Sequence, residues 1–194
     1  MLYFFIYSLL IIIVVFDIYM AIKLFEHTYC FCIRHQPPFV ASNDYERQLV
    51  VEIIKNKYPD AKNICEIGSG FGGLARTIAH NTNTNVYALE NMPFSAFVSK
   101  VSDKISRCKN NKTIWTDAFK YLDNTDMNFD IAIAYLGPTY TPIIKNYKNK
   151  INTLISLDFE IKGNKPKQVI DIGHGYTIYK RKKYPHRIFI YEFK

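Results

Sequence analysis

A short apolar run that leads straight into a glycine-rich turn is the feature that most constrains how this chain folds. The stretch NICEIGSGFGG spans residues 63–73, and a helix is predicted to follow over about 72–79. A run this short suits a buried strand, and the glycines allow a sharp turn into the helix. A second run, NVYALE, ends at Glu90, and Pro93 then opens another predicted helix. The pattern predicts strand–helix–strand units in a parallel sheet.

The alternation continues along the chain. Strands are predicted over 112–116 and 129–135, and the second is apolar enough to be covered on both faces. Thr141 and Pro142 are predicted as the N-cap and first residue of a helix that reaches Ile151. Three strand-like runs follow without convincing helices, over 153–161, 168–180 and 187–193. We therefore expect an α/β fold whose sheet is mostly parallel and ends in an antiparallel C-terminal hairpin.

Two helices carry clear local signals. Asn43 and Glu46 have the spacing of a capping box ahead of an apolar helical face. After Pro93, apolar residues recur at helical spacing, which predicts an amphipathic helix. These residues are Phe94, Phe97, Val98, Val101 and Ile105.

The N-terminus predicts a membrane helix. Residues 2–25 are apolar apart from Asp17 and Lys23. At about 1.5 Å per helical residue the segment reaches roughly 36 Å, enough to cross a hydrocarbon core of about 30 Å. A basic start and a small-residue cleavage site, which mark a secretory signal peptide, are not evident. The predicted organisation is an uncleaved transmembrane anchor over 1–25, a linker over 26–42 and a domain over 43–194.

Charge predicts the orientation of this single-pass protein. Lys and Arg follow the apolar segment and none precedes it, so the domain is expected to face the cytoplasm. The formal net charge is +8, and the basic run at 179–187 suits either anionic headgroups or an exposed hairpin tip. No nucleic-acid motif or zinc spacing is present, so neither nucleic acid nor metal is expected. Cys30 and Cys32, beside the anchor, suit lipidation or the role of interfacial thiols.

The glycine turn fits two binding patterns. Gly68, Gly70 and Gly73 match the dinucleotide pattern G-x-G-x-x-G. Glu66, Gly68, Gly70 and Gly72 match a more specific pattern in which an acid precedes the glycines. An acid at this point can meet the ammonium of an amino-acid ligand, whereas it would repel a pyrophosphate.

Two further acids follow the next predicted strands. Glu90 lies about 20 residues after the turn, where a carboxylate binds ribose hydroxyls, and Asp117 can accept from an adenine amino group. Together these residues predict a site for a nucleoside that carries an amino acid. The predicted cofactor-binding residues are Glu66, Gly68, Ser69, Gly70, Gly72, Glu90, Asn91, Asp117 and Ala118.

This arrangement resembles the class I S-adenosylmethionine-dependent methyltransferases over about residues 63–140, which implies a Rossmann-like sheet and S-adenosyl-L-methionine as cofactor. The membrane segment, PPFVASN, EIGSGFGGLAR and LENMPF further resemble the mitochondrial lysine methyltransferases of the ATP synthase c subunit and the adenine nucleotide translocase, with their bacterial relatives. Pro38 to Val40 match that group's Pro-Phe-Val segment. Met92, inserted before Pro93, and Phe71, where an acid is usual, depart from it.

The same resemblance places the methyl acceptor at YLGPTY, residues 135–140, which loosely resembles the Asn/Asp-Pro-Pro-Tyr loop of amino-directed methyltransferases. The missing leading Asn or Asp argues against methylation of nucleic-acid bases. Tyr135, Pro138 and Tyr140 are the predicted catalytic-loop residues, with ordinary packing as the alternative for the two tyrosines. The carbonyls of Leu136 or Gly137 could orient an amine. No general base is predicted, and the histidines are given no role.

The predicted function is a membrane-anchored S-adenosylmethionine-dependent methyltransferase that modifies a lysine of a membrane protein. One alternative is an NAD(P)-dependent oxidoreductase that uses the G-x-G-x-x-G pattern. Another is a non-catalytic, methyltransferase-like assembly factor. A second glycine run, VIDIGHG over 169–175, lacks a following helix and is predicted to be a strand that runs into a hairpin turn.

Overall fold

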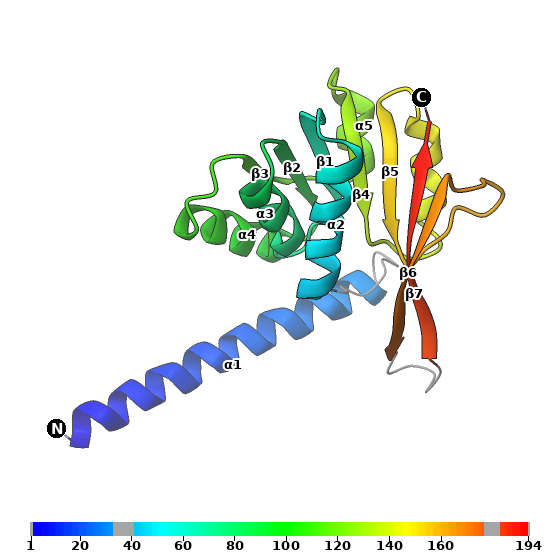
Figure 1. Cartoon of the computed structure of the whole chain (residues 1–194). Coiled ribbons are helices and arrows are strands. Elements are labelled where there is room, and N and C mark those ends of the chain that lie inside the picture. Colours follow the sequence, from blue (N-terminus) through cyan, green and yellow to red (C-terminus); the bar gives the residue numbers. More distant parts are fainter. Residues whose placement is uncertain (1, 33–40, 177–182, 194) are drawn as a thin grey trace. The chain divides into compact units, whose positions relative to one another are not determined.

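The computed structural model describes residues 2–32, 41–176 and 183–193, and it divides into two compact units, Met1–Phe39 and Val40–Lys194 (Figure 1). The first unit contains one helix, α1 (Leu2–Cys32). Its stretch Tyr3–Ile22 is long and apolar enough to cross a membrane, by length and composition. The hydroxyls of Ser8 and Thr28 donate to backbone carbonyls one turn earlier, so these polar groups are satisfied within the helix.

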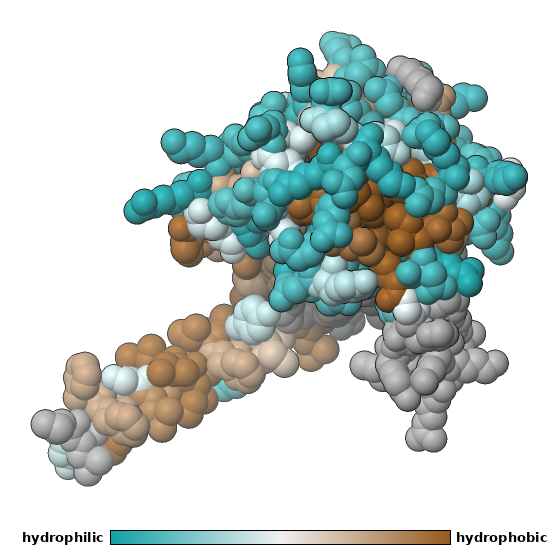
Figure 2. Space-filling view, in the orientation of Figure 1, coloured by the Kyte–Doolittle hydropathy of each residue, from teal (hydrophilic) through white to brown (hydrophobic). Residues whose placement is uncertain are grey.

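The helix extends beyond the predicted anchor. Residues 26–32 were expected in the linker, yet they continue α1, since the first proline occurs only at Pro37. The rest of that linker up to Val40, which includes the Pro38–Val40 motif, lies outside the described residues. Figure 2 shows apolar residues along most of the visible face of α1.

The second unit is built on a seven-stranded sheet in the order β3-β2-β1-β4-β5-β7-β6. The first five strands are parallel, and β7 pairs antiparallel with both β5 and β6. The sequence prediction of a mostly parallel sheet with an antiparallel C-terminal hairpin is therefore confirmed. The strands are β1 (Asn63–Ile67), β2 (Asn85–Glu90), β3 (Asn111–Trp115), β4 (Phe129–Ala134), β5 (Ile151–Leu157), β6 (Gln168–Tyr176) and β7 (Lys183–Glu192).

Helices cover both faces of this sheet. On one face, the buried side chains of α2 (Asp44–Lys57) and α3 (Gly73–Asn81) pack on one set of alternate strand residues, and α4 (Pro93–Ile105) lies over β2 and β3. On the other face, α5 (Ala118–Asn124) and the 3₁₀ helix η1 (Thr141–Tyr147) pack on the remaining set. Asn43 caps α2 with the predicted capping box, as its side chain and that of Glu46 each accept from the other's backbone N–H.

After β3 the structure differs from the sequence prediction at two places. The sequence showed no clear signal for α5, which Asp117 nonetheless caps. The helix predicted to reach Ile151 is a short 3₁₀ helix that ends at Tyr147, and Ile151 instead opens β5. The reason is strand pairing, because the Lys150 carbonyl accepts from the Phe129 amide at the start of β4.

The predicted amphipathic helix α4 is present, but much of the apolar face that its sequence pattern indicates is exposed and not buried. Its buried residues are small or polar, and Phe97, Val101 and Ile105 are exposed. The buried polar side chains find partners: Ser99 bonds Thr113 at 2.8 Å, and Asp103 accepts from Thr113 and Asn111 of β3 and from Arg76 of α3. Hydrogen bonds, and not apolar contact, thus decide which face of α4 meets the sheet.

The second glycine run lies within β6, as the sequence predicts. A bulge between Asp171 and Gly173 interrupts its pairing with β7, and Gly173 has a positive φ of 106°. Residues 177–182, where the hairpin turn is predicted, lie outside the described residues, and so does the first part of the basic run, 179–182.

Candidate functional site

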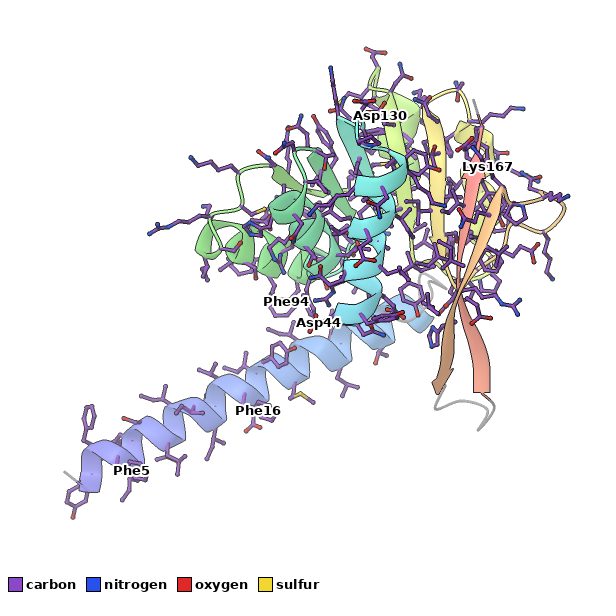
Figure 3. The ribbon with its side chains drawn as sticks, in the orientation of Figure 1. Phe5, Phe16, Asp44, Phe94, Asp130 and Lys167 are labelled. Carbon is purple, nitrogen blue, oxygen red and sulfur yellow. The ribbon has the colours of Figure 1, made fainter. Side chains whose placement is uncertain are left out.

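The site lies where the parallel strands end, which we call the carboxyl edge of the sheet. In Figure 3, Asp44 at the start of α2 and Phe94 at the start of α4 mark this edge, and Asp130 near the start of β4 marks the opposite one. In an open α/β sheet, loops at the carboxyl ends of the strands form the ligand crevice. The predicted cofactor-binding residues all follow or end strands here.

The glycine loop connects β1 to α3 and has little room for side chains. Gly68, Gly70 and Gly72 all have positive φ, at 75°, 55° and 69°. A Cβ at Gly72 would lie 2.1 Å from the Ser99 hydroxyl, and one at Gly68 would lie 2.9 Å from Cδ2 of Leu136. Both conformation and space therefore require glycine. The Gly68 and Ser69 amides donate to the Leu89 carbonyl, which fixes the loop on β2.

Glu66 has a buried carboxyl group with one oxygen available to accept a hydrogen bond. Its Oε2 has no hydrogen-bond partner among the described residues, and neither has the hydroxyl of Ser69 in the loop. Burial, with a further contribution from nearby Glu90, raises the pKa of Glu66 to about 8. A hydrogen bond from the Ala75 amide opposes this rise. An arriving ammonium group would satisfy the orphan oxygen and favour the ionised form.

Glu90 is also buried and ties the end of β2 to the glycine loop. Its Oε2 accepts from the Gly70 amide at 2.6 Å, and its Oε1 accepts from the Met92 amide at 2.7 Å. These two bonds fix the orientation of the carboxyl group at the end of β2. This geometry suits the predicted contact with a ribose.

Asn91, Asp117 and Ala118 complete the predicted set. The Asn91 carbonyl accepts from the indole N–H of Trp115 at 3.1 Å, which joins the ends of β2 and β3. Asp117 caps α5 through Oδ1, which accepts from Phe119 and Lys120 amides, and Ala118 is the first residue of that helix. The cap holds the Asp117 carboxyl at the carboxyl edge, next to β2.

Two arginines near the loop did not stand out in the sequence. Arg76 of α3 donates to the Phe71 carbonyl at 2.7 Å and pairs with Asp103 at 3.2 Å. Arg47 of α2 packs over Gly73, since a Cβ there would lie 2.9 Å from its guanidinium carbon. Both guanidinium groups lower the pKa of Glu66, although burial prevails. Their positions depend on helix packing, so no local motif marks them.

The predicted acceptor loop, residues 135–140, follows β4 at the same edge. The Gly137 carbonyl accepts from the amides of Tyr140 and Thr141, and the Leu136 carbonyl accepts from the Thr141 hydroxyl at 2.8 Å. The Gly137 carbonyl is thus engaged by its own turn and the Leu136 carbonyl retains one acceptor position. Pro138 is exposed, and Tyr135 and Tyr140 are half-buried.

Tyr135 belongs to a polar cluster that the sequence did not predict. Its hydroxyl donates to Oδ2 of Asp158 at 2.6 Å. Asp158 also bonds Nδ1 of His186, at 2.8 Å to Oδ2. Glu46 of α2 lies 3.6 Å from the same nitrogen. We call Glu46, Tyr135, Asp158 and His186 the Asp158 cluster.

The cluster brings together four distant parts of the chain at the carboxyl edge. Asp158 follows the last residue of β5 and has a positive φ of 63°, and His186 lies on β7. Burial raises the pKa of Glu46, and burial together with Asp158 raises that of Tyr135. The sequence could have pointed to Asp158, because an acid directly after a strand lies at the carboxyl edge, as Glu90 and Asp117 do. No sequence signal marked His186, because its contact with Asp158 depends on the antiparallel pairing of β7 with β5.

Comparisons with known proteins place this geometry in context. No protein-family model matches the sequence, and no curated protein matches it. Solved structures match the fold. An RNA methyltransferase from Salinibacter ruber in complex with S-adenosyl-L-homocysteine has a TM-score of 0.65 at 14% identity, over 79% of this chain and 94% of that one.

Two further structures agree. The precorrin-6y C5,15-methyltransferase from Geobacter metallireducens has a TM-score of 0.60 at 12% identity, over 80% of this chain and 91% of that one. TrmK from M. capricolum, in complex with S-adenosyl-homocysteine, has a TM-score of 0.56 at 16% identity, over 78% and 69%. The second unit of this chain therefore has the Rossmann-like fold of the class I S-adenosylmethionine-dependent methyltransferases.

Proposed function

We propose that this protein is a membrane-anchored S-adenosylmethionine-dependent methyltransferase that modifies a lysine amine of a membrane-associated protein. The observation that carries the proposal is the buried Glu66 carboxyl, whose Oε2 is unpartnered among the described residues beside a loop of positive-φ glycines. This donor set fits a zwitterionic nucleoside. The pyrophosphate of NAD(P) offers this carboxyl no ammonium partner, and its negative charge would oppose ionisation of Glu66.

Named residues would hold the cofactor. Glu66 would take its ammonium, Glu90 its ribose hydroxyls, and the start of α5 at Asp117 and Ala118 its adenine edge. The glycine loop permits close approach of the backbone. When bound, the cofactor supplies an activated methyl group on a sulfonium that leaves as a neutral thioether.

The residues of the protein would then align the acceptor amine with the methyl group and exclude water. The loop at residues 135–140 forms one wall at the carboxyl edge, and the Asp158 cluster lies behind it with two carboxylates, Glu46 and Asp158. Negative charge at this point favours a cationic acceptor, and a half-buried aromatic ring such as that of Tyr140 suits an ammonium group. The amine must lose its proton before it attacks, which partial desolvation promotes by lowering its pKa.

Membrane anchoring is supported by α1, because no part of its apolar stretch Tyr3–Ile22 is buried. Such an anchor raises the local concentration of membrane proteins around the domain. The Lys and Arg residues that follow this stretch support a domain on the cytoplasmic side.

Binding and product analysis test the proposal. The full chain in detergent is expected to be stabilised against heat by S-adenosylhomocysteine and not by NAD(H) or NADP(H); stabilisation by the nicotinamide nucleotides alone would establish the oxidoreductase alternative. Deletion of the gene is expected to remove a mass shift of one or more methyl groups from a lysine of a membrane protein. An unchanged set of methylated membrane proteins would contradict the proposed acceptor.

Complementation separates an enzyme from an assembly factor. Glu66→Ala and Gly70→Asp alter the predicted cofactor site and should fail to restore the methyl mark and the deletion phenotype. Full rescue by both variants would favour a non-catalytic role.

A further inference from the structure

The outward face of α4 and the adjoining edge strand carry an unusual combination of residues. Phe97, Val101 and Ile105 recur every four residues along α4 and are 63%, 38% and 79% exposed. Trp115 at the end of β3 is 61% exposed. By the alternation of a strand it lies on the same face of β3 as Asn111 and Thr113, which bond Asp103 of α4.

Basic side chains surround these apolar groups. Between residues 97 and 115, four exposed basic residues lie on α4 or in the turn that follows it: Lys100, Lys104, Arg107 and Lys109. The one acid in this stretch, Asp103, is buried and paired with Arg76. In Figure 2, hydrophobic atoms lie beside hydrophilic ones over the region of α4. We call these four basic residues together with Phe97, Val101, Ile105 and Trp115 the α4 surface.

We propose that the α4 surface docks on an anionic lipid bilayer. A helix with exposed aliphatic and aromatic residues beside lysines is suited to the boundary between headgroups and acyl chains. The lysines complement anionic headgroups, and an exposed indole is favoured at this depth. Among the described residues of the domain, the other exposed large apolar side chains are Tyr45, Ile143 and Val169, which are scattered and need no such explanation.

Two observations favour lipid over other occupants. The aliphatic tips of Val101 and Ile105 gain from a hydrocarbon environment, whereas single-stranded nucleic acid is bound mainly by aromatic stacking and positive charge. The four exposed basic residues would repel their copies across a two-fold interface between copies of this chain, because such an interface places the same surface on both partners. An anionic bilayer satisfies both the charge and the apolar groups.

Docking here would place the start of α4, directly after Glu90 and Asn91, close to the bilayer surface. The carboxyl edge would then open beside the membrane, where a protein substrate presents residues near the headgroups. The inference concerns where the domain lies. It holds whether or not lysine is the acceptor, and its readout requires no methyl transfer.

The chain provides its own probe, since Trp115 is its single tryptophan. The full chain would be reconstituted into vesicles of phosphatidylcholine alone or mixed with phosphatidylglycerol, with brominated acyl chains as quenchers. Trp115 emission is expected to shift to the blue and to be quenched in the anionic vesicles, and to do neither in the neutral ones. High salt should reverse the effect.

Matched variants identify the groups responsible. Lys100→Gln with Lys104→Gln should weaken docking about 25-fold, from roughly fivefold for each basic residue at an anionic surface. The control pair Lys162→Gln and Lys165→Gln removes the same charge from exposed positions between β5 and β6 and should leave quenching unchanged. Ile105→Ser should reduce quenching, and Val169→Ser, at another exposed apolar position, should not.

Three outcomes would overturn the inference. Equal quenching in neutral and anionic vesicles would show that the anchor alone sets the position of Trp115. A blue shift in detergent that depends on protein concentration would identify a second copy as the occupant. A change in Trp115 emission on adding single-stranded RNA in detergent, without lipid-dependent quenching, would identify nucleic acid.

Discussion

The backbone amide of Gly70 donates to Oε2 of Glu90 across 2.6 Å, so the glycine loop and the acid that ends β2 form one connected unit. The carboxylate stays in place without a ligand, because Met92 holds its other oxygen at 2.7 Å. Such preorganisation lowers the entropy cost of binding. Removal of either partner should therefore affect affinity for a nucleoside more than it affects the fold.

Glu90→Gln tests this unit. Hydrogen bonds to a charged group contribute about 1.5–3 kcal/mol, so we expect the Kd for S-adenosylhomocysteine to rise roughly 10- to 150-fold. Isothermal titration of the full chain in detergent measures this change. Glu52→Gln, the same substitution at an exposed position of α2, is the control and should leave Kd unchanged. Equal affinity in all three proteins would exclude Glu90 from the site.

Gly72→Ala tests the need for glycine in the loop. Gly72 has a φ of 69°, and a Cβ would meet the Ser99 hydroxyl at 2.1 Å. Gly163→Ala is a matched control, because Gly163 has a φ of 81° and nothing lies within 4 Å of its Cβ position. We expect a loss of about 1–2 kcal/mol for the control, from the backbone alone, and a further loss of about 1–3 kcal/mol for Gly72→Ala from overpacking. Urea unfolding measures both, and equal losses would contradict the steric argument.

The stability of the ligand-free protein should depend on pH through Glu66. Its pKa is about 8 in the fold, against an ordinary value of 4.5. Between these values the folded protein keeps a proton that the unfolded chain releases, so the stabilising contribution is complete at low pH and is lost as pH rises through about 8. Glu66→Gln stays neutral and should remove this part of the decline. Urea unfolding at a series of pH values compares the two proteins, and parallel curves would contradict the raised pKa.

Ligand binding should release a proton for the same reason. Near neutral pH the buried Glu66 carboxyl is largely protonated, and pairing with an ammonium favours its ionised form. We expect about one proton to be released for each S-adenosylhomocysteine bound at neutral pH, and none from this group in Glu66→Gln. Titration calorimetry in buffers of different ionisation enthalpy counts the protons. Undiminished release in the variant would assign them to another group.

Asp158→Asn tests the proposed attraction of a cationic acceptor. Asparagine tolerates the positive φ of 63° at this position, so the change removes charge without added backbone strain. We expect KM for the acceptor protein to rise about tenfold or more, equivalent to roughly 1.4 kcal/mol, while Kd for S-adenosylhomocysteine stays within about twofold. Steady-state methyl transfer and calorimetry measure the two quantities. A change in cofactor affinity alone would show that the Asp158 cluster supports the loop and not the acceptor.

Local sequence signals predicted the strands and the turn that surround the candidate cofactor site. Strands β1 and β2 have the predicted bounds, and the Asn43–Glu46 capping box is present. The three acids Glu66, Glu90 and Asp117 lie at one edge because parallel strands bring their carboxyl ends together. Each of these features depends on a few neighbouring residues and on a general rule of sheet geometry. They could therefore be predicted without knowledge of the packing.

The polar contacts around Asp158 could not be predicted in the same way. The Asp158 cluster joins residues 46, 135, 158 and 186, and its hydrogen bonds exist only once α2, β4, β5 and β7 have assembled. The exposure of the apolar side chains of α4 also depends on contacts between distant parts of the chain. The apolar spacing of this helix indicates a buried face, but Asp103 and Ser99 find hydrogen-bond partners on α3 and β3 and are buried instead.

Local conformational preference and hydrophobic pattern are enough to specify the alternation of strands and helices, the glycine loop and the apolar N-terminal segment. The pairing of polar groups, and hence the choice of exposed faces, depends on how the helices and strands pack together. A buried polar side chain must find a partner, and here that partner comes from a distant part of the chain.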